Sequence, residues 1–262
     1  MTAKPFASSA DLSEKTETLE VLADGVYALT AEGDPNVGAI EGEDFLVAFE
    51  ARATPVAARE WLDKLREHTD KPVRYLVLSH YHAVRVLGAS AFDADVIITH
   101  ETTRKLIAER GKQDWESEYG RMPRLFKQPA SIPGLTWPDV TFSDRLSIDL
   151  GGDRGELVLQ YCGRGAVPRG RGAVDAAIEQ TRDFLVVMRE KVGAVHARGG
   201  SLAEAFHATH EALAPRYGRW PIFEHCLPFD VQRMWDELDG IDWPRIWTAE
   251  RDREVWDQLQ GP

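Results

Sequence analysis

Short apolar runs separated by turn residues dominate the chain up to residue 110, and their order restricts the fold more than any other feature. Residues 19–29 carry an Asp24-Gly25 turn between two β-prone stretches, and residues 36–49 repeat this arrangement, so two hairpins are predicted. The apolar spacing then predicts helices over 56–69, 89–92 and 101–110 and buried strands over 73–79 and 95–99. Strands that alternate with helices in this order predict an α/β fold.

The second half of the chain passes from strands to helices. Residues 111–138 are rich in Trp, Pro and basic side chains and are expected to form an ordered insertion. The later expected elements are strands over 140–142, 146–150 and 156–161, helices over 176–192, 201–214 and 229–238, and a short tail over 243–260. Ser201 and Glu204 have the spacing of a capping box. The predicted division is a disordered leader (1–18), an α/β domain (19–192) and a C-terminal helical extension (193–262).

Charge and composition exclude several classes of partner. The 262 residues include 31 basic and 43 acidic side chains, and the net charge of −12 argues against a nucleic-acid partner. No apolar run approaches the about 20 residues that cross a membrane, and the N-terminus lacks the apolar core of a secretion signal. Cys162 and Cys226 do not make a disulfide framework. A cytoplasmic protein that binds neither membranes nor nucleic acids is therefore expected.

The loop after the first buried strand carries the clearest chemical signal. His80 and His82 stand two residues apart directly after the strand over 73–79. On a loop at the end of a strand, both imidazoles can converge on one point, which is half of a tetrahedral zinc site. A His-x-His pair alone is more often a pair of loop or capping histidines than half of a metal site, so the metal site needs further support.

That support comes from a resemblance. Leu78-Ser-His-Tyr-His82 resembles the central motif of the metallo-β-lactamase-fold hydrolases. Further segments that resemble the family begin at Asp24 (Asp-Gly-Val-Tyr), Asn36 (Asn-Val-Gly), Glu50 (Glu-Ala-Arg-Ala-Thr-Pro) and Gly88 (Gly-Ala-Ser-Ala-Phe). The resemblance covers about residues 19–165 and implies an αβ/βα sandwich of two mixed sheets. Helices lie outside the sheets of this fold, and the metal site lies on loops at one edge.

The same resemblance implies that the metal site is incomplete. The family motif reads His-x-His-x-Asp-His, and this chain has Val84 in place of the Asp and Arg85 in place of the last His. Valine has no donor atom, and arginine is a fixed cation that does not bind zinc. A second metal ion is therefore not expected. Glu50 stands where the family often has an Asp that contacts the metal ligands. Glu50, His100 or a second copy of the chain are the candidates for a third ligand to zinc beside His80 and His82.

The ligands that the family supplies later in its sequence have no counterpart here. The sequence Gly-Arg-Gly-Ala-Val occurs twice, at 163–167 and 170–174, and the chain passes directly into helices from Asp175. The deletion or omission of a segment between two similar sites explains this junction, and so does a Gly/Arg-rich linker. Either way, the second half of the sandwich is expected to be truncated.

We therefore expect a hydrolase-like protein with an incomplete zinc site and weak or no conventional metal-dependent hydrolysis. The alternative is a non-catalytic, oligomerising scaffold or binding protein on the same fold. The loss of strands exposes sheet edges and apolar surface, so a homodimer is predicted. In one form of this dimer, the two copies exchange their C-terminal helices. The small-molecule substrate is not readable from the sequence. His207 and His210, and the His225-Cys226 pair, are interpreted as surface or structural residues.

Overall fold

The computed structural model describes residues 14–31, 34–159, 171–220 and 223–259. Contacts within the chain divide it into two compact units, and the division between them falls between Tyr161 and Cys162. The boundary predicted at residue 192 lies inside a helix of the second unit. The predicted leader lies largely outside the described residues, and the first strand begins at its last residue, Thr18.

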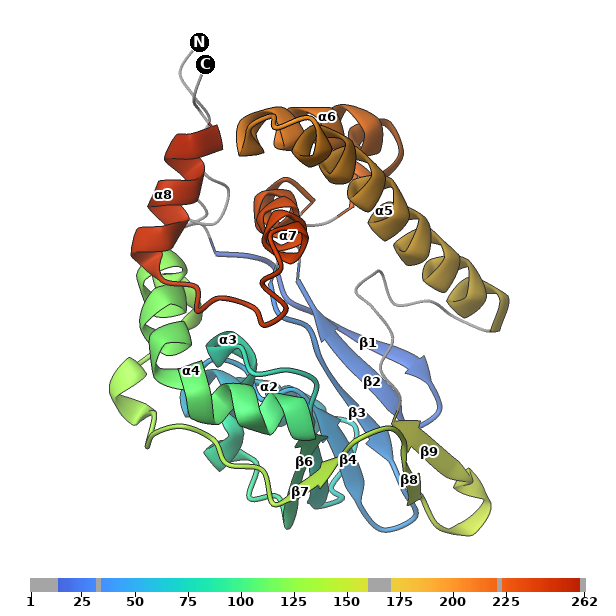
Figure 1. The fold of residues 1–262 in the computed structure, drawn as a ribbon. Coiled ribbons are helices and arrows are strands. Elements are labelled where there is room, and N and C mark those ends of the chain that lie inside the picture. The colour runs from blue at the N-terminus through green and yellow to red at the C-terminus, as the bar shows by residue number, and fades with distance from the viewer. Residues whose placement is uncertain (1–13, 32–33, 160–170, 221–222, 260–262) are drawn as a thin grey trace. The chain divides into compact units, whose positions relative to one another are not determined.

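The first unit is built on one sheet whose strands follow one another in chain order (Figure 1). The first four strands pair antiparallel, and the remaining pairs are parallel. The strands are β1 (Thr18–Ala23), β2 (Val26–Thr30), β3 (Val37–Glu41), β4 (Leu46–Phe49), β5 (Val73–Leu78), β6 (Val96–His100) and β7 (Val140–Phe142). Both predicted hairpins are confirmed, and Gly25 adopts the left-handed φ of 66° that the first turn requires.

Alternation along the strands separates two cores. Leu76 and Leu78 of β5 pack in the core that also contains Trp61 of α2 (Pro55–Leu65). Val77, between them, belongs to the core that contains Ile148 of β8 (Leu146–Asp149). Because neighbouring side chains of a strand point to opposite faces, α2 covers one face of the sheet and β8 the other.

The second layer of strands is short. β8 pairs antiparallel with β9 (Glu156–Leu159), and these two strands form the second described sheet. This arrangement of helices, a mixed sheet and a two-stranded sheet confirms the predicted α/β class. The small second sheet agrees with the predicted truncation.

One prediction for the first unit is wrong. α4 (Glu101–Arg121) continues eleven residues beyond the predicted end at Arg110, into the stretch read as an insertion. The apolar periodicity fails there because the helix buries polar side chains, among them Asp114, Ser117 and Glu118. Between β5 and β6 lie α3 (Ala83–Val86) and a 3₁₀ turn (Ala89–Ala91). The 3₁₀ turn is the short helix predicted over 89–92.

The second unit is helical. It contains α5 (Arg171–Ala197), α6 (Leu202–Tyr217), α7 (Phe223–Leu238) and α8 (Ala249–Leu259). The capping box is confirmed, because Glu204 N donates to Ser201 Oγ at 3.2 Å and Ser201 N donates to Glu204 Oε2 at 2.7 Å. The tail expected over 243–260 instead contains α8. Within the described part of the chain, no helix has the length and apolar character that crossing a membrane requires.

Candidate metal centre

The loop between β5 and α3 holds the two histidines of the motif. His80 follows the strand after Ser79, and its Nδ1 lies 2.7 Å from Ser79 Oγ. His82 is the residue that precedes the first turn of α3. The two imidazole centroids are 4.8 Å apart, with the rings inclined by 70°. The two rings are therefore in contact, but of the two histidines it is His82 whose ring nitrogen meets other possible ligand atoms among the described residues.

Two carboxyl groups from α4 reach the same loop. Asp114 Oδ2 accepts a hydrogen bond of 2.7 Å from Ala83 N, and Glu118 Oε2 accepts one of 2.8 Å from Val84 N. The first N–H groups of a helix have no partner inside it, so these carboxylates complete the start of α3. Their spacing of four residues places both on one face of α4.

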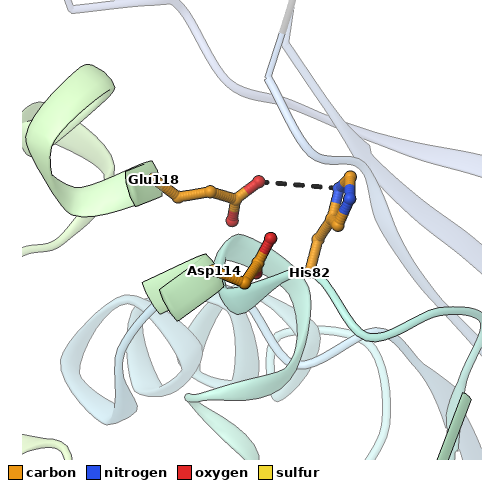
Figure 2. A group of neighbouring side chains, drawn as sticks. All are labelled: His82, Asp114 and Glu118. Atoms are coloured by element: carbon orange, nitrogen blue, oxygen red, sulfur yellow. Dashed lines mark ion pairs between the residues drawn. The ribbon is translucent and has the colours of Figure 1, made fainter. Parts of the chain in front are cut away.

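Three possible ligand atoms meet at this point. His82 Nδ1 lies 3.5 Å from Glu118 Oε1, and Figure 2 shows both carboxyl groups turned toward the imidazole. One ligand atom each from His82, Asp114 and Glu118 lie within 4.8 Å of one another. Sequence reasoning missed the two carboxylates. The Asp-x-x-x-Glu spacing was the available signal, but the segment was interpreted as an insertion rather than a helix.

Burial sets the electrostatics of the two carboxyl groups. Asp114 is 7% and Glu118 is 3% exposed. Burial raises the pKa of both groups, and the charge of Asp114 further raises the pKa of Glu118. The positive charges of Arg121 and Arg110 lower the pKa of Asp114 without cancelling the effect of burial. Both groups therefore hold their protons more tightly than an exposed carboxyl group does.

Glu50 supports the loop from the end of β4. Its Oε1 accepts a hydrogen bond of 3.0 Å from Ser79 N, while its Oε2 is buried without a hydrogen-bond partner among the described residues. Burial raises the pKa of Glu50, and the charge of Arg85 acts in the opposite direction. The backbone at Glu50 has a φ of 64°, a conformation that is uncommon for a residue other than glycine. This contact is of the supporting kind that the resemblance implies for this position.

The side chains at the two substituted motif positions lie in different surroundings. Val84 is 5% exposed and packs in the core on the helical face of the sheet. Arg85 is half-buried, and one of its terminal nitrogens donates to Asn36 O at 3.3 Å. Neither position supplies a metal-binding atom.

The other candidate histidines have structural roles or lie elsewhere. His100 precedes α4, where its Nδ1 accepts from Thr102 N at 3.1 Å and its Nε2 lies 3.0 Å from Ser143 O. Both ring nitrogens are thereby engaged, so His100 is not the third ligand. His207 and His210 belong to α6 in the second unit, and both rings contact Phe206. Cys226 is half-buried in α7, and the side chain of His225 lies outside the described residues.

No protein-family model matches the chain. The chain is 30% identical over 148 residues to the 2,4-dinitroanisole O-demethylase subunit alpha of Nocardioides sp. (strain JS1661). That match covers 55% of this chain but 39% of the relative, so this chain spans well under two thirds of the relative's length.

Three solved structures illustrate what the chain is similar to. A double mutant of the sec-alkyl sulfatase PisA1 is 24% identical and matches 40% of this chain and 17% of its own, with a TM-score of 0.34. The metallo-β-lactamase FIM-1 of Pseudomonas aeruginosa, in its mono-zinc form, is 17% identical over 37% of this chain and 46% of its own (TM-score 0.31). A metallo-β-lactamase of Erythrobacter litoralis is 14% identical over 50% of this chain and 54% of its own (TM-score 0.33). Each of these likenesses covers half of this chain or less, and membership of the metallo-β-lactamase fold superfamily stays a prediction from the motif around His80 and His82.

Proposed function

We propose that the chain is a hydrolase-like protein of the metallo-β-lactamase fold whose loop holds at most one metal ion and supports weak or no conventional metal-dependent hydrolysis. The observation that carries the proposal is the pair of substituted motif positions, two and three residues after His82. Val84 turns into the apolar core, and Arg85 brings a permanent positive charge to the loop.

The charge of Arg85 is felt by both buried acids beside the loop. It opposes the effect of burial on the pKa of Glu50 and on the pKa of Glu118. A fixed guanidinium that compensates these carboxylates occupies the electrostatic role of a second metal ion. Its presence supports a centre with one cation site rather than two, because a second divalent ion would meet a like charge.

Metal-assisted hydrolysis requires an ion with an open coordination position, where a bound water loses its proton near neutral pH. His80 and His82 are the motif ligands that remain, and Glu50 engages Ser79 N with one oxygen. The curated relative is named as an O-demethylase of 2,4-dinitroanisole, which makes that compound a reasonable test substrate beside a β-lactam.

The proposal is tested by the metal content and turnover of the purified full chain. After saturation with Zn²⁺ and removal of excess metal, elemental analysis should find no more than one zinc ion per chain. Turnover of 2,4-dinitroanisole or a β-lactam should stay close to the uncatalysed rate. Two tightly bound ions per chain, or rapid metal-dependent turnover, would show that the proposal is wrong.

A second candidate function, an oligomerising scaffold or binding protein, is favoured by a separate observation. Ile178, Leu185 and Val186 of α5 are 48%, 50% and 48% exposed. Apolar side chains that gather on one helix are typical of a contact surface. We propose a homodimer that covers this face, in line with the sequence-based expectation.

Light scattering at micromolar concentration tests the dimer. Wild-type protein should have twice the mass of one chain, and Leu185→Glu should shift it to the mass of one chain. Leu238→Glu is the matched control, because Leu238 is also exposed (39%) but belongs to α7. A wild-type monomer would contradict the prediction.

A further inference from the structure

The meeting of one imidazole and two buried carboxylates beside the loop goes beyond the motif that the sequence supplies. His82 comes from the loop after β5, directly before α3, whereas Asp114 and Glu118 come from the C-terminal half of α4. Three protein ligands with one open position is the usual arrangement of a catalytic zinc site, and nitrogen and carboxylate oxygen are both zinc ligands. The two motif histidines alone supply only half of a tetrahedral set.

We infer that the chain binds one divalent transition-metal ion, with Zn²⁺ as its probe, through His82, Asp114 and Glu118. This inference deepens the proposed function, since it identifies the ligands of the single ion that the proposal allows. His80, although it belongs to the motif, is not required. The ligand set is thus completed by α4 rather than by the missing later segments of the fold.

The geometry needs only a small adjustment. Zinc bonds of 2.0–2.1 Å to nitrogen and oxygen place tetrahedral ligand atoms about 3.3 Å apart. His82 Nδ1 and Glu118 Oε1 already lie at 3.5 Å, and all three ligand atoms lie within 4.8 Å. Contraction to that spacing requires small side-chain rotations, and His82, which is partly exposed on the loop, has room for one.

In each carboxylate, one oxygen accepts a backbone hydrogen bond, which leaves the other oxygen to bind a metal ion. Asp114 uses Oδ2 for Ala83 N, and Glu118 uses Oε2 for Val84 N. These bonds hold both groups in orientation and leave Glu118 Oε1 turned toward the imidazole (Figure 2). Hydrogen bonds that orient a ligating carboxylate are a regular feature of metal sites. A purely structural role, as caps of α3, is the competing explanation that an experiment must separate.

Amide substitutions make that separation. Asn at 114 and Gln at 118 retain a carbonyl oxygen for the N–H groups of Ala83 and Val84, but they lose the charge and most of the affinity for a metal ion. Glu116→Gln is the matched control, because Glu116 lies between them on α4 and is exposed. His80→Ala and His82→Ala compare the two motif histidines.

The test is calorimetric titration of the metal-free full chain with Zn²⁺ near neutral pH, with circular dichroism to check folding. Wild type, Glu116→Gln and His80→Ala should bind one equivalent with equal affinity. His82→Ala, Asp114→Asn and Glu118→Gln should each weaken binding by more than about tenfold, the least that the loss of even a supporting partner costs.

Three results would overturn the inference. The first is a wild-type chain that binds no Zn²⁺, which leaves the proposed function standing. The second is binding that survives both amide variants but is lost with His80→Ala. The third uses no variant: X-ray absorption of the zinc-loaded wild type should fit one imidazole, and two imidazoles would contradict the ligand set. Two ions per chain, in contrast, would defeat the proposed function itself.

Discussion

Two buried acidic sites in the first unit differ in how their charge is compensated. Glu41, 8% exposed, accepts hydrogen bonds from Tyr27 Oη at 2.7 Å and from Lys71 Nζ at 2.6 Å. Burial raises its pKa, but these two donors outweigh burial, and the pKa of Glu41 is lowered. Asp114 and Glu118 lie deeper in the protein, and there burial wins and the pKa of both groups is raised.

The difference teaches which buried carboxylates serve the fold and which are available to a ligand. Lys71 supplies a full positive charge at contact distance, so Glu41 is satisfied by the chain itself. Asp114 and Glu118 accept from backbone N–H groups, and Glu118 also lies beside an imidazole. Nearby arginine side chains lower the pKa of both carboxyl groups, but these charges do not outweigh burial. Buried acids whose charge is not fully compensated in this way are candidates for binding a cation.

The largest expected effect comes from adding a negative charge near Asp114 and Glu118, where burial outweighs the compensating charges. Val84→Asp combined with Arg85→His restores the family motif, but it buries a third carboxylate near Glu118 and removes a cation. We expect a loss of about 3–5 kcal/mol in the free energy of unfolding, the scale of an uncompensated buried charge. No gain in hydrolysis should follow, because the later ligands are still missing.

Urea unfolding and turnover of 2,4-dinitroanisole check this double variant. Arg85→His alone is the control, and it should cost less because the core position Val84 stays apolar. Robust metal-dependent turnover by the double variant would show that the motif substitutions, rather than the missing segments, silence the centre.

A smaller effect is expected when the compensated site is broken. Lys71→Met leaves Glu41 buried with Tyr27 as a hydrogen-bond donor and with the guanidinium of Arg154 at 3.5 Å. The free energy of unfolding should fall by about 1–3 kcal/mol, as for a buried group that loses a charged partner. Because Lys71 is itself 28% exposed, the lower part of that range is expected.

Lys127→Met is the matched control for this loss. Lys127 Nζ also lies 2.6 Å from a glutamate, Glu60 Oε2, but both side chains are more than two fifths exposed. An exposed pair contributes about 0–1 kcal/mol, so this variant should unfold almost as the wild type does. If both variants lost the same free energy of unfolding, the burial of Glu41 would not explain the effect of Lys71.

The last expected effect is a difference in pH dependence. In the metal-free protein, Asp114 and Glu118 keep their protons in the folded state after the unfolded chain has released them near pH 4. Stability should therefore fall as the pH rises from there toward the raised folded pKa, by at most about 1.4 kcal/mol per pH unit and carboxyl group. Glu41 has a lowered pKa and gives the opposite sign, a loss as the pH falls.

Urea unfolding at a series of pH values, with a chelator present, measures this dependence. The double variant Asp114→Asn with Glu118→Gln should lose the decline on the alkaline side and keep the decline on the acid side. Glu116→Gln should change neither. An unchanged alkaline decline in the double variant would mean that other groups cause it.

Local patterns were enough for much of the first unit. The Asp24-Gly25 turn and the apolar run of β5 depend on residues close in the chain, and both predictions are confirmed. The His80 and His82 loop was found in the same way, because it follows a recognisable buried strand.

By itself, then, the sequence determined the α/β class, both hairpins, and the loop with its substituted positions Val84 and Arg85. Only the tertiary structure decided that α4 continues past Arg110 and brings Asp114 and Glu118 to that loop. The physical reason is that the burial of these carboxylates is made possible by hydrogen bonds from backbone N–H groups, and these groups lie more than thirty positions earlier in the chain. Such bonds leave no apolar periodicity in the helix, and any residue at positions 83 and 84 other than proline can supply the N–H.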